Sequence, residues 1–413
     1  KKRASNIKHR AINNLDKYLI TFESNFSKRG GKVIWALDAK QAVDEIINIL
    51  DKKEIRTVVK SKSSTSHEIE INENLKKKNI EPVETDLGEF IAQINDEKPY
   101  HIISPIIQKS KEEVSQIFNK KYNLPVNSLP EEITSFVRNL LREEFINSNA
   151  SITGANFLIA DIGGVVITEN EGNALLCSSL PKVHIVLAGI EKIIPSVNDL
   201  DLMLPLLATH GTGQKITVYN TIITGPRQEN EIDGPDEMYV ILLDNNRTKI
   251  LSKKEQRNAL SCIKCGACLN SCPIYRTVGG KTYGSAYSGP IAAVTIPIMY
   301  GYSNYKHLSY ASTLCGKCTE VCPVKIPLHE LLIFNRHEIV KESKPELKEK
   351  IALLLIKKVL LNRKLMNFAS NKTKDKILSK LFRKGWGNKR QLPVFAEKTF
   401  NQIWKEKNLA QNK

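Results

Sequence analysis

Seven of the eight cysteines of this 413-residue chain lie in two short runs. The first run has the spacing C-x2-C-x2-C-x3-C-P and contains Cys262, Cys265, Cys268 and Cys272, followed by Pro273. This spacing is typical of bacterial ferredoxins, in which thiolates bind an iron–sulfur cube and the last cysteine binds a second cluster. The alternative is a zinc site, but four-cysteine zinc sites usually consist of two pairs separated by a longer loop. The run therefore predicts iron–sulfur chemistry.

The second run repeats the end of the first but has one cysteine fewer, because Ser312 stands where its leading cysteine would be. In two-cluster ferredoxins the last cysteine of each run binds the cluster of the other run. This exchanged pattern predicts two groups of ligands: Cys262, Cys265, Cys268 and Cys322 for one cluster, and Cys272, Cys315 and Cys318 for the other. Both clusters are nominally [4Fe–4S]. For the second, three options stay open: ligation by Ser312, a [3Fe–4S] cluster, or a cube with one open iron. Two neighbouring clusters form a relay, which is why we predict electron transfer.

We interpret Cys177, in the apolar segment NALLCSS, as a small buried residue and not as a ligand.

A second candidate site lies in the first half of the chain. The segment Lys60, Ser61, Lys62 and Ser63 follows a predicted strand and precedes a predicted helix, the place where open α/β sheets bind anions. A solvated capping loop is an equally good interpretation. Glu169 and Glu171 link two predicted strands, either as a simple hairpin turn or as carboxylates that line a small-molecule site. No complete G-x-G-x-x-G and no P-loop occurs, so nucleotide binding is not predicted, and no catalytic residue is assigned.

The elements that must position these residues alternate between strand and helix from residue 30 to residue 245. Apolar periodicity predicts strands at Lys32–Leu37, Thr57–Val59, His101–Ser104, Phe157–Ala160, Val165–Thr168, Ala174–Ser178, Val183–Ala188, Lys215–Thr224 and Glu237–Asp244. It predicts helices at Asp38–Leu50, Ser64–Lys78, Lys111–Lys120 and Glu131–Asn147. Strands separated by helices in this way indicate βαβ units and a mostly parallel sheet.

Composition suggests four parts in sequence order. These are an α/β domain at residues 1–245, a polar linker at 246–258, a mainly helical two-cluster domain at 259–338, and a basic tail at 339–413. Within the cluster domain, Val278–Tyr305 is rich in Gly, Tyr and Pro and has little periodicity. The tail has helical apolar spacing, which predicts one or two amphipathic helices.

The net charge of +17 is concentrated in the tail. Lys341–Lys413 contains 20 Lys and Arg but 6 Asp and Glu, so +14 of the charge lies in the last 73 residues. Because no nucleic-acid recognition module is present, we expect no nucleic-acid partner. Two interpretations of the tail remain. It contacts a partner subunit or an anionic membrane surface, or it is simply a solvated helix face.

The location of the protein is also constrained by its sequence. No apolar run approaches the roughly 18 residues of a membrane span, and KKRASNIKHR at the N-terminus is not followed by the apolar stretch of a secretory signal. Cysteines spaced for metal and not for disulfides indicate a reducing compartment. We therefore expect a cytoplasmic protein without a transmembrane segment.

The chain resembles the lactate utilization protein B family, in which an N-terminal LUD domain precedes a dicluster ferredoxin domain. The likeness spans nearly the whole chain and is carried by both cysteine runs and by further motifs: KSKS at Lys60–Ser63, ETDLGE at Glu84–Glu89, TGANF at Thr153–Phe157, ITENEGN at Ile167–Asn173, YGSAYSGPI at Tyr283–Ile291 and ASTLCGKCTEVCPVKIPLH at Ala311–His329. The family pattern also has serine at the position of Ser312.

The resemblance implies a LUD domain with a fold like that of sugar isomerases and CoA-transferases. It also implies oxidation of L-lactate to pyruvate in complex with a second LUD-domain protein and a cysteine-rich iron–sulfur subunit. We therefore expect an electron-transfer subunit of an oxidoreductase and not a stand-alone enzyme. The alternative is a LUD-domain oxidoreductase that acts directly on another 2-hydroxy acid, with the incomplete second cluster or the LUD pocket as its substrate site.

Overall fold

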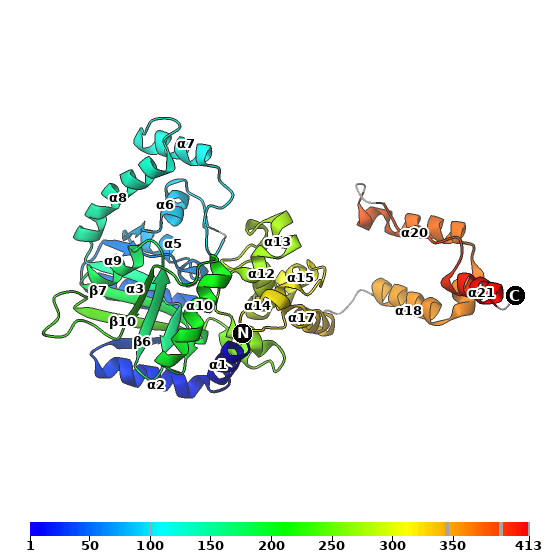
Figure 1. Ribbon diagram of the computed structural model, residues 1–413, viewed down its shortest axis with the longest axis horizontal. Helices are drawn as coiled ribbons and strands as arrows, with labels where there is room; N and C mark the ends of the chain where they lie inside the picture. The colour runs from blue at the N-terminus through cyan, green and yellow to red at the C-terminus, as the bar shows by residue number, and fades with distance from the viewer. Residues whose placement is uncertain (100, 343–346, 388–390, 412–413) are drawn as a thin grey trace. The chain divides into compact units, whose positions relative to one another are not determined.

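The computed structural model describes residues 1–99, 101–342, 347–387 and 391–411. The chain divides into two compact units after Glu342 (Figure 1). Both predicted sites lie in the first unit, which combines the α/β part and the cysteine-rich part of the chain.

The main sheet of the first unit has six strands, all parallel, in the order β1-β10-β7-β4-β2-β3. Their bounds are β1 Lys32–Ala36, β2 Thr57–Lys60, β3 Glu81–Glu84, β4 Ala150–Gly154, β7 Val183–Gly189 and β10 Glu237–Leu243. β7 is buried along its whole length, as expected of a central strand covered on both faces. This arrangement confirms the predicted α/β class and the parallel sheet. Because all strands are parallel, their carboxyl ends lie at one edge.

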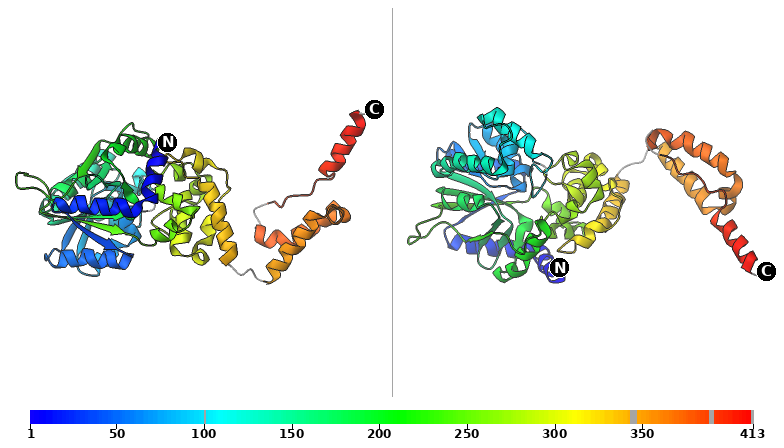
Figure 2. Two further views of the ribbon diagram at one scale, coloured as in Figure 1. Left: turned by 90° about the horizontal axis from the view of Figure 1, so that it is seen from below. Right: turned by 45° about the horizontal axis from the view of Figure 1, so that its top comes forward.

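Successive residues of β10 enter different cores, as the two-residue period of a strand requires. Val240 and Leu242 belong to the core that includes α1 (Lys2–Asn13) and α2 (Leu15–Lys28). Ile241 and Leu243 belong to the core that includes α3 (Ala39–Asp51) and α5 (Ile71–Lys76). These helices thus cover the two faces of the sheet (Figure 2). α7 (Lys111–Tyr122) and α8 (Pro130–Asn147), both predicted, form a third core with α6 (Leu87–Ile94).

A smaller sheet packs against the α1–α2 side in the order β8-β5-β6-β9. Its strands are β5 Phe157–Ile159, β6 Gly164–Glu169, β8 Ile193–Ile194 and β9 Tyr219–Ile223, and α10 (Leu200–Gly211) precedes β9.

Three local predictions in this region are wrong. Ala174–Ser178 is not a strand but lies in the helix α9 (Asn173–Ser179), and His101–Ser104 is irregular. Residues 64–78 form α4 (Ser64–Glu68) and α5 instead of one helix, because Glu70 between them has a left-handed backbone with φ 51°. Short apolar segments do not distinguish a strand from a buried helix.

The cysteine-rich part is mainly helical, as predicted. Its helices are α12 Ala267–Asn270, α13 Pro273–Val278, α14 Gly289–Tyr300, α15 Tyr302–Tyr310, α16 Lys317–Val321 and α17 Leu328–Glu342. The interval Val278–Tyr305, which showed little periodicity, contains the helix α14. All its residues from Gly289 to Met299 are buried. A helix buried on every side has no polar face and therefore no amphipathic signal.

Residues 246–258, predicted as a polar linker, are packed into the unit. They form α11 (Arg247–Leu251) and the start of the 3-10 helix η3 (Gln256–Ser261), and the Arg247 side chain is only 3% exposed. Its guanidinium binds Glu68 of α4 (Nη2–Oε2 2.7 Å) and Glu191 after β7 (Nε–Oε2 2.5 Å). The Tyr287 hydroxyl, from the cysteine-rich part, donates to the same Glu68 carboxylate at 2.5 Å. Arg247 thus joins the two parts of the unit.

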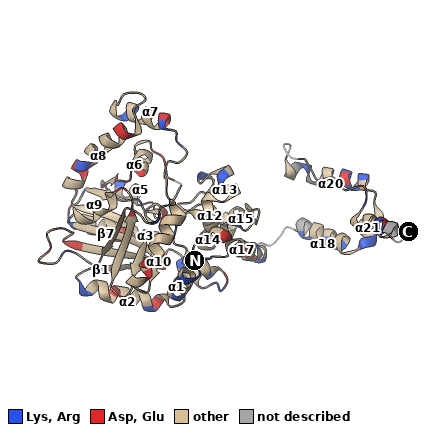
Figure 3. Ribbon diagram, viewed as in Figure 1, with Lys and Arg blue, Asp and Glu red and all other residues tan. Residues whose placement is uncertain are grey.

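The described residues of the second unit form four helices, whereas the sequence predicted one or two. They are α18 Leu347–Leu361, α19 Arg363–Phe368, α20 Asn371–Trp386 and α21 Phe400–Gln411. Lys and Arg mark α18 and α20 in Figure 3. Leu353, Leu354 and Leu355 are each 57–59% exposed, so α18 does not bury one apolar face within this unit. Among the described residues, no helix is long and apolar enough to cross a membrane.

The buried ion pairs of Arg247 predict a large loss of stability when the guanidinium is removed. Arg247→Met would leave Glu68 and Glu191 buried without their partner, which typically costs about 3–5 kcal/mol. Urea unfolding followed by circular dichroism measures this loss. The matched control is Arg227→Met, because the Arg227–Asp236 pair (2.7 Å) is 46% and 45% exposed and such pairs contribute at most about 1 kcal/mol. Equal losses in the two variants would contradict the prediction.

Candidate iron–sulfur centre and adjacent cavity

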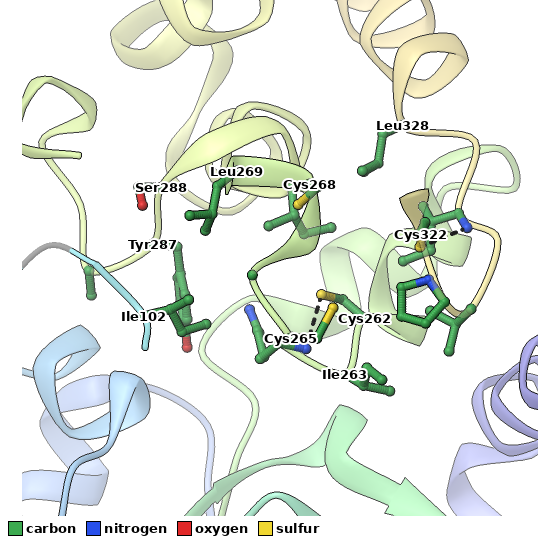
Figure 4. A pocket seen from close by; sticks show the side chains of 17 residues that line it. Ile102, Cys262, Ile263, Cys265, Cys268, Leu269, Tyr287, Ser288, Cys322 and Leu328 are labelled. Carbon is green, nitrogen blue, oxygen red and sulfur yellow. Dashed lines mark hydrogen bonds between the residues drawn. The ribbon is translucent and has the colours of Figure 1, made fainter. Parts of the chain in front are cut away.

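The loop of the first cysteine run curls so that its thiols face one space. Lys264 and Gly266 have positive φ angles, 60° and 78°, which turn the chain tightly between the cysteines. Cys262, Cys265 and Cys268 line one cavity together with Cys322 from the second run (Figure 4). The Lys264 amide donates to Cys262 Sγ at 3.4 Å and the Ile326 amide to Cys322 Sγ at 3.3 Å. Such bonds to sulfur tune the potential of a cluster.

The remaining three cysteines form a second group nearer the surface. Burial raises the pKa of Cys318, and the thiols of Cys272 and Cys315 lie close enough to raise it further. Cys315 itself is exposed. Four of the seven cysteines therefore line one cavity, and Cys318 lies near the other two. Their role as ligands remains a prediction.

The two runs share a local geometry that includes the position of Ser312. Gly266 and Gly316 have the same backbone angles, φ 78° and ψ −7°. The Leu314 amide donates to Ser312 Oγ at 3.2 Å, just as the Lys264 amide donates to Cys262 Sγ. Ser312 Oγ therefore occupies the place in the second run that Cys262 Sγ occupies in the first.

The arrangement of the cysteines fits a cluster better than a single ion. Within the described ranges, no three Cys, His, Asp or Glu side chains converge closely enough to hold one metal ion. A single zinc ion would draw its thiolates to about 2.3 Å from one point, whereas a cube binds each thiolate at a different corner. The four-cysteine group surrounds a shared cavity, which satisfies the second requirement.

Cys177 is not a member of either group. It is fully buried in α9, within the core of α7 and α8, and burial raises the pKa of its thiol to about 12. The interpretation as a small buried apolar residue agrees with this environment, although the segment is a helix and not the predicted strand.

A second cavity, of about 280 Å³, opens at the carboxyl edge of the main sheet. Ser61, Lys62 and Ser63 follow β2, and Asn156 follows β4. β2 and β4 are neighbours in the sheet, but the chain continues from β2 to β3 on one side and from β4 to β7 on the other. The space between the ends of β2 and β4 is therefore a topological switch point. Such crevices are the usual ligand sites of open α/β sheets. A β-carbon on Gly154, at the end of β4, would lie 2.8 Å from Ser63 Oγ, so glycine permits this close approach.

One of the four loop residues predicted as a possible ligand site lies outside the cavity. Lys60 does not line the cavity, because its fully buried ammonium group pairs with Glu84 on the neighbouring strand β3 (Nζ–Oε1 2.7 Å). Ser61, Lys62 and Ser63 do line it. Lys62 binds Asp86 at 3.1 Å and the carbonyl of Ile103 at 2.9 Å.

Glu169 and Glu171 line the cavity as well, but the turn that holds them is not a hairpin between strands. It joins β6 to α9, and the Glu169 carboxylate accepts hydrogen bonds from the amides of Ala174 (3.0 Å) and Leu175 (2.7 Å). It thereby caps the helix N-terminus. Partial burial and the charge of Asp86 raise the pKa of Glu171.

The two cavities are separated by a thin wall. Lys264, Cys265 and Tyr287 line both of them. Lys192, which follows β7, also lines the larger cavity. Lys192, Lys264 and Tyr287 were not among the predicted site residues, because they approach the site from distant parts of the chain. The one signal that could have found Lys192 is its place three residues after β7, a strand that is buried along its whole length.

Comparisons with known protein families also divide the first unit into an α/β part and a cysteine-rich part. Residues 19–243 match the LUD domain and residues 258–326 match the 4Fe-4S dicluster domain. Lactate utilization protein B of Anoxybacillus flavithermus is 44% identical over 349 residues, which covers 84% of this chain and 74% of that protein. The namesake of Oceanobacillus iheyensis is 40% identical over 423 residues, covering 98% and 86%. A crystal structure of a DUF162 family protein from Deinococcus radiodurans matches 56% of this chain and 98% of its own at 13% identity, with a TM-score of 0.32.

The fold and the cysteines together define an iron–sulfur protein with a LUD domain and a 4Fe-4S dicluster domain. More particularly, the chain belongs to the lactate utilization protein B family. The predicted family and domain types are thereby confirmed.

The exchanged pattern predicts that Cys322 and Cys318 bind different clusters, whereas their closeness in the sequence suggests that they bind the same one. Cys322→Ser should alter the EPR signal of the cluster bound by the first run, although Cys322 is four residues from Cys318. Cys318→Ser should alter the other signal. Cys177→Ser is the control and should leave both clusters intact, because Cys177 belongs to neither group. If the Cys322 and Cys318 variants perturb the same cluster, the pattern is wrong.

The geometry at Ser312 leads to a prediction about iron content. Ser312→Cys should supply an eighth thiolate in a position prepared for it and give two four-iron cubes, which iron analysis and low-temperature EPR would detect. Ser312→Ala should keep the second cluster on its three cysteines. Loss of that cluster in Ser312→Ala would instead identify the hydroxyl as a ligand, and an unchanged EPR signal of the second cluster in Ser312→Cys would contradict the prepared position.

Proposed function

We propose that this protein is the iron–sulfur electron-transfer subunit of a cytoplasmic complex that oxidises L-lactate to pyruvate. The cysteines would hold two clusters, one on Cys262, Cys265, Cys268 and Cys322 and one on Cys272, Cys315 and Cys318. The relatives' name supports the link to lactate utilization. When bound, the clusters supply one-electron redox chemistry, and the chain contributes their ligands, their spacing and their contacts with the LUD cavity.

The observation that carries this proposal is the unequal exposure of the two cysteine groups. The four-cysteine group shares Cys265 with the wall of the LUD cavity, whereas Cys315 of the other group is exposed. A relay needs one inner site that faces the electron source and one outer site that a partner can approach. The two groups meet these needs, with electrons moving from the inner cluster toward Cys315.

The partners of such a subunit would be a second LUD-domain protein and a cysteine-rich iron–sulfur subunit. The exposed apolar and basic residues of the second unit suit contact with a partner or with an anionic membrane surface. All eight cysteines are free, which is consistent with a reducing compartment.

A second candidate function is direct oxidation of a 2-hydroxy acid by this chain alone. It is favoured by the cavity that opens against Cys265. In that case the isolated chain, and not only the complex, would take electrons from substrate.

Cluster reduction separates the two functions. The reconstituted protein is mixed anaerobically with L-lactate, with and without its co-purified partner subunits, and bleaching of the cluster absorbance is followed. We expect reduction only with the partners present. A Cys265→Ser variant in the complex should block it, because the inner cluster would lose a ligand. Reduction of the isolated chain by L-lactate would support the second function, and no reduction in either mixture would contradict the proposed role in L-lactate oxidation.

A further inference from the structure

Lys192 lies in the wall of the LUD cavity as a buried cation. It ends the short helix η1 (Ile190–Lys192) that follows β7, and it is only 9% exposed. Within the part of the chain that the structure describes, no hydrogen bond or salt bridge of its ammonium group is found, and the neighbouring Glu191, whose carboxylate binds Arg247, acts on it only through its charge. Because Lys192 lines the cavity, its positive charge favours an anion bound there.

A comparison with Lys8 shows that the fold does provide partners for a buried lysine elsewhere. Lys8 is 1% exposed, and its ammonium group donates to the carbonyl oxygens of Glu191 (2.6 Å) and Ile193 (3.2 Å). Burial lowers the pKa of both Lys8 and Lys192 to about 8, so both remain mainly charged at neutral pH. The difference is that Lys192 faces a cavity and Lys8 faces backbone.

The other two lysines of the cavity are already engaged. Lys62 is held by Asp86 and by the Ile103 carbonyl, and Lys264 lies 3.7 Å above the centre of the Tyr287 ring. Among the lysines that line the cavity within the described residues, Lys192 therefore has the one unengaged ammonium group. It is near enough to Cys262 for the thiol to affect its pKa, which places it beside the four-cysteine group.

The rest of the cavity suits a small polar ligand. Its volume of about 280 Å³ falls just below the roughly 300–1,000 Å³ of pockets for drug-sized molecules. Asn156 supplies a donor. Its Oδ1 accepts from the Thr168 amide at 3.0 Å, and no bond of its Nδ2 is found in the described ranges. The ammonium group of Lys192 and this amide are thus two donors that line the same cavity.

We propose that the LUD cavity binds a small 2-hydroxy or 2-oxo carboxylate, with its carboxylate on the ammonium group of Lys192. The inference deepens the proposed function and rests on it for the identity of the adjacent cluster. Binding itself requires no electron transfer. Lys192 acts as a binding residue that holds the ligand against the wall formed by Lys264, Cys265 and Tyr287.

Equilibrium dialysis of the cluster-loaded full chain against radiolabelled L-lactate and pyruvate tests the site. Lys192→Met should weaken binding about ten- to hundredfold, because hydrogen bonds to charged groups contribute about 1.5–3 kcal/mol. Lys192→Arg, which keeps the charge, should retain most of the affinity. Iron content, measured for each variant, establishes that the clusters and the fold are intact.

Lys8→Met is the matched control. It also removes a buried lysine whose pKa is affected by Cys262, but Lys8 does not line the cavity. Its affinity for both acids should therefore equal that of the wild type. The proposal is overturned if the wild type binds neither acid at millimolar concentration, or if Lys192→Met with full iron content binds them as well as the wild type does.

The outcome is distinguishable from that of the proposed function. If lactate binds through Lys192 but never reduces the clusters in the assembled complex, the electron-transfer proposal fails and the binding site stands. If the complex is reduced by lactate while Lys192→Met reduces equally well and binds normally, the binding site fails and electron transfer stands.

Discussion

The guanidinium of Arg247 is the contact on which the arrangement of this protein depends. It is bound by Glu68 and Glu191, which lie in the helices that follow the carboxyl ends of β2 and β7, and Tyr287 from the cysteine-rich part donates to the Glu68 carboxylate. Burial alone would raise the pKa of Glu191, but the charges of Arg247, Lys264 and Lys192 lower it to about 2. Gly189 makes room for the pair, since a β-carbon there would overlap both charged groups. A buried ion pair is weak evidence for added stability, but this one fixes which surfaces meet.

The two surfaces that Arg247 joins are the edge of the main sheet, which holds the cavity, and the loop that contains the first cysteine run. A parallel sheet collects the ends of β2, β4 and β7 at one place, and the loop of Cys265 closes that place from the other side. The protein thus places the cavity of the LUD domain against Cys265, which lines both cavities. Cys315, in the other cysteine group, is exposed.

Much of this could be predicted from the sequence because the information is local. The cysteine spacing alone implies the grouping later found around the inner cavity, since the loop geometry of each run is set by residues within it. The periods of α3, α7 and α8 were also readable. The failures involve burial that local pattern cannot encode. α14 is apolar all round, Ala174–Ser178 has the composition of a strand, and the polar stretch after residue 245 conceals Arg247. Lys192 carries no motif, because its importance comes from what surrounds it in space.

The position of β10 affects how the chain can fold during synthesis. This last strand of the main sheet lies between β1 and β7, so β1 has no neighbour in the sheet until residues 237–243 have been made. Such long-range pairing is slow because a large loop must close before the contact forms. Cys262 follows only a short distance along the chain. The first cysteine run is therefore synthesised soon after the strand that completes the main sheet.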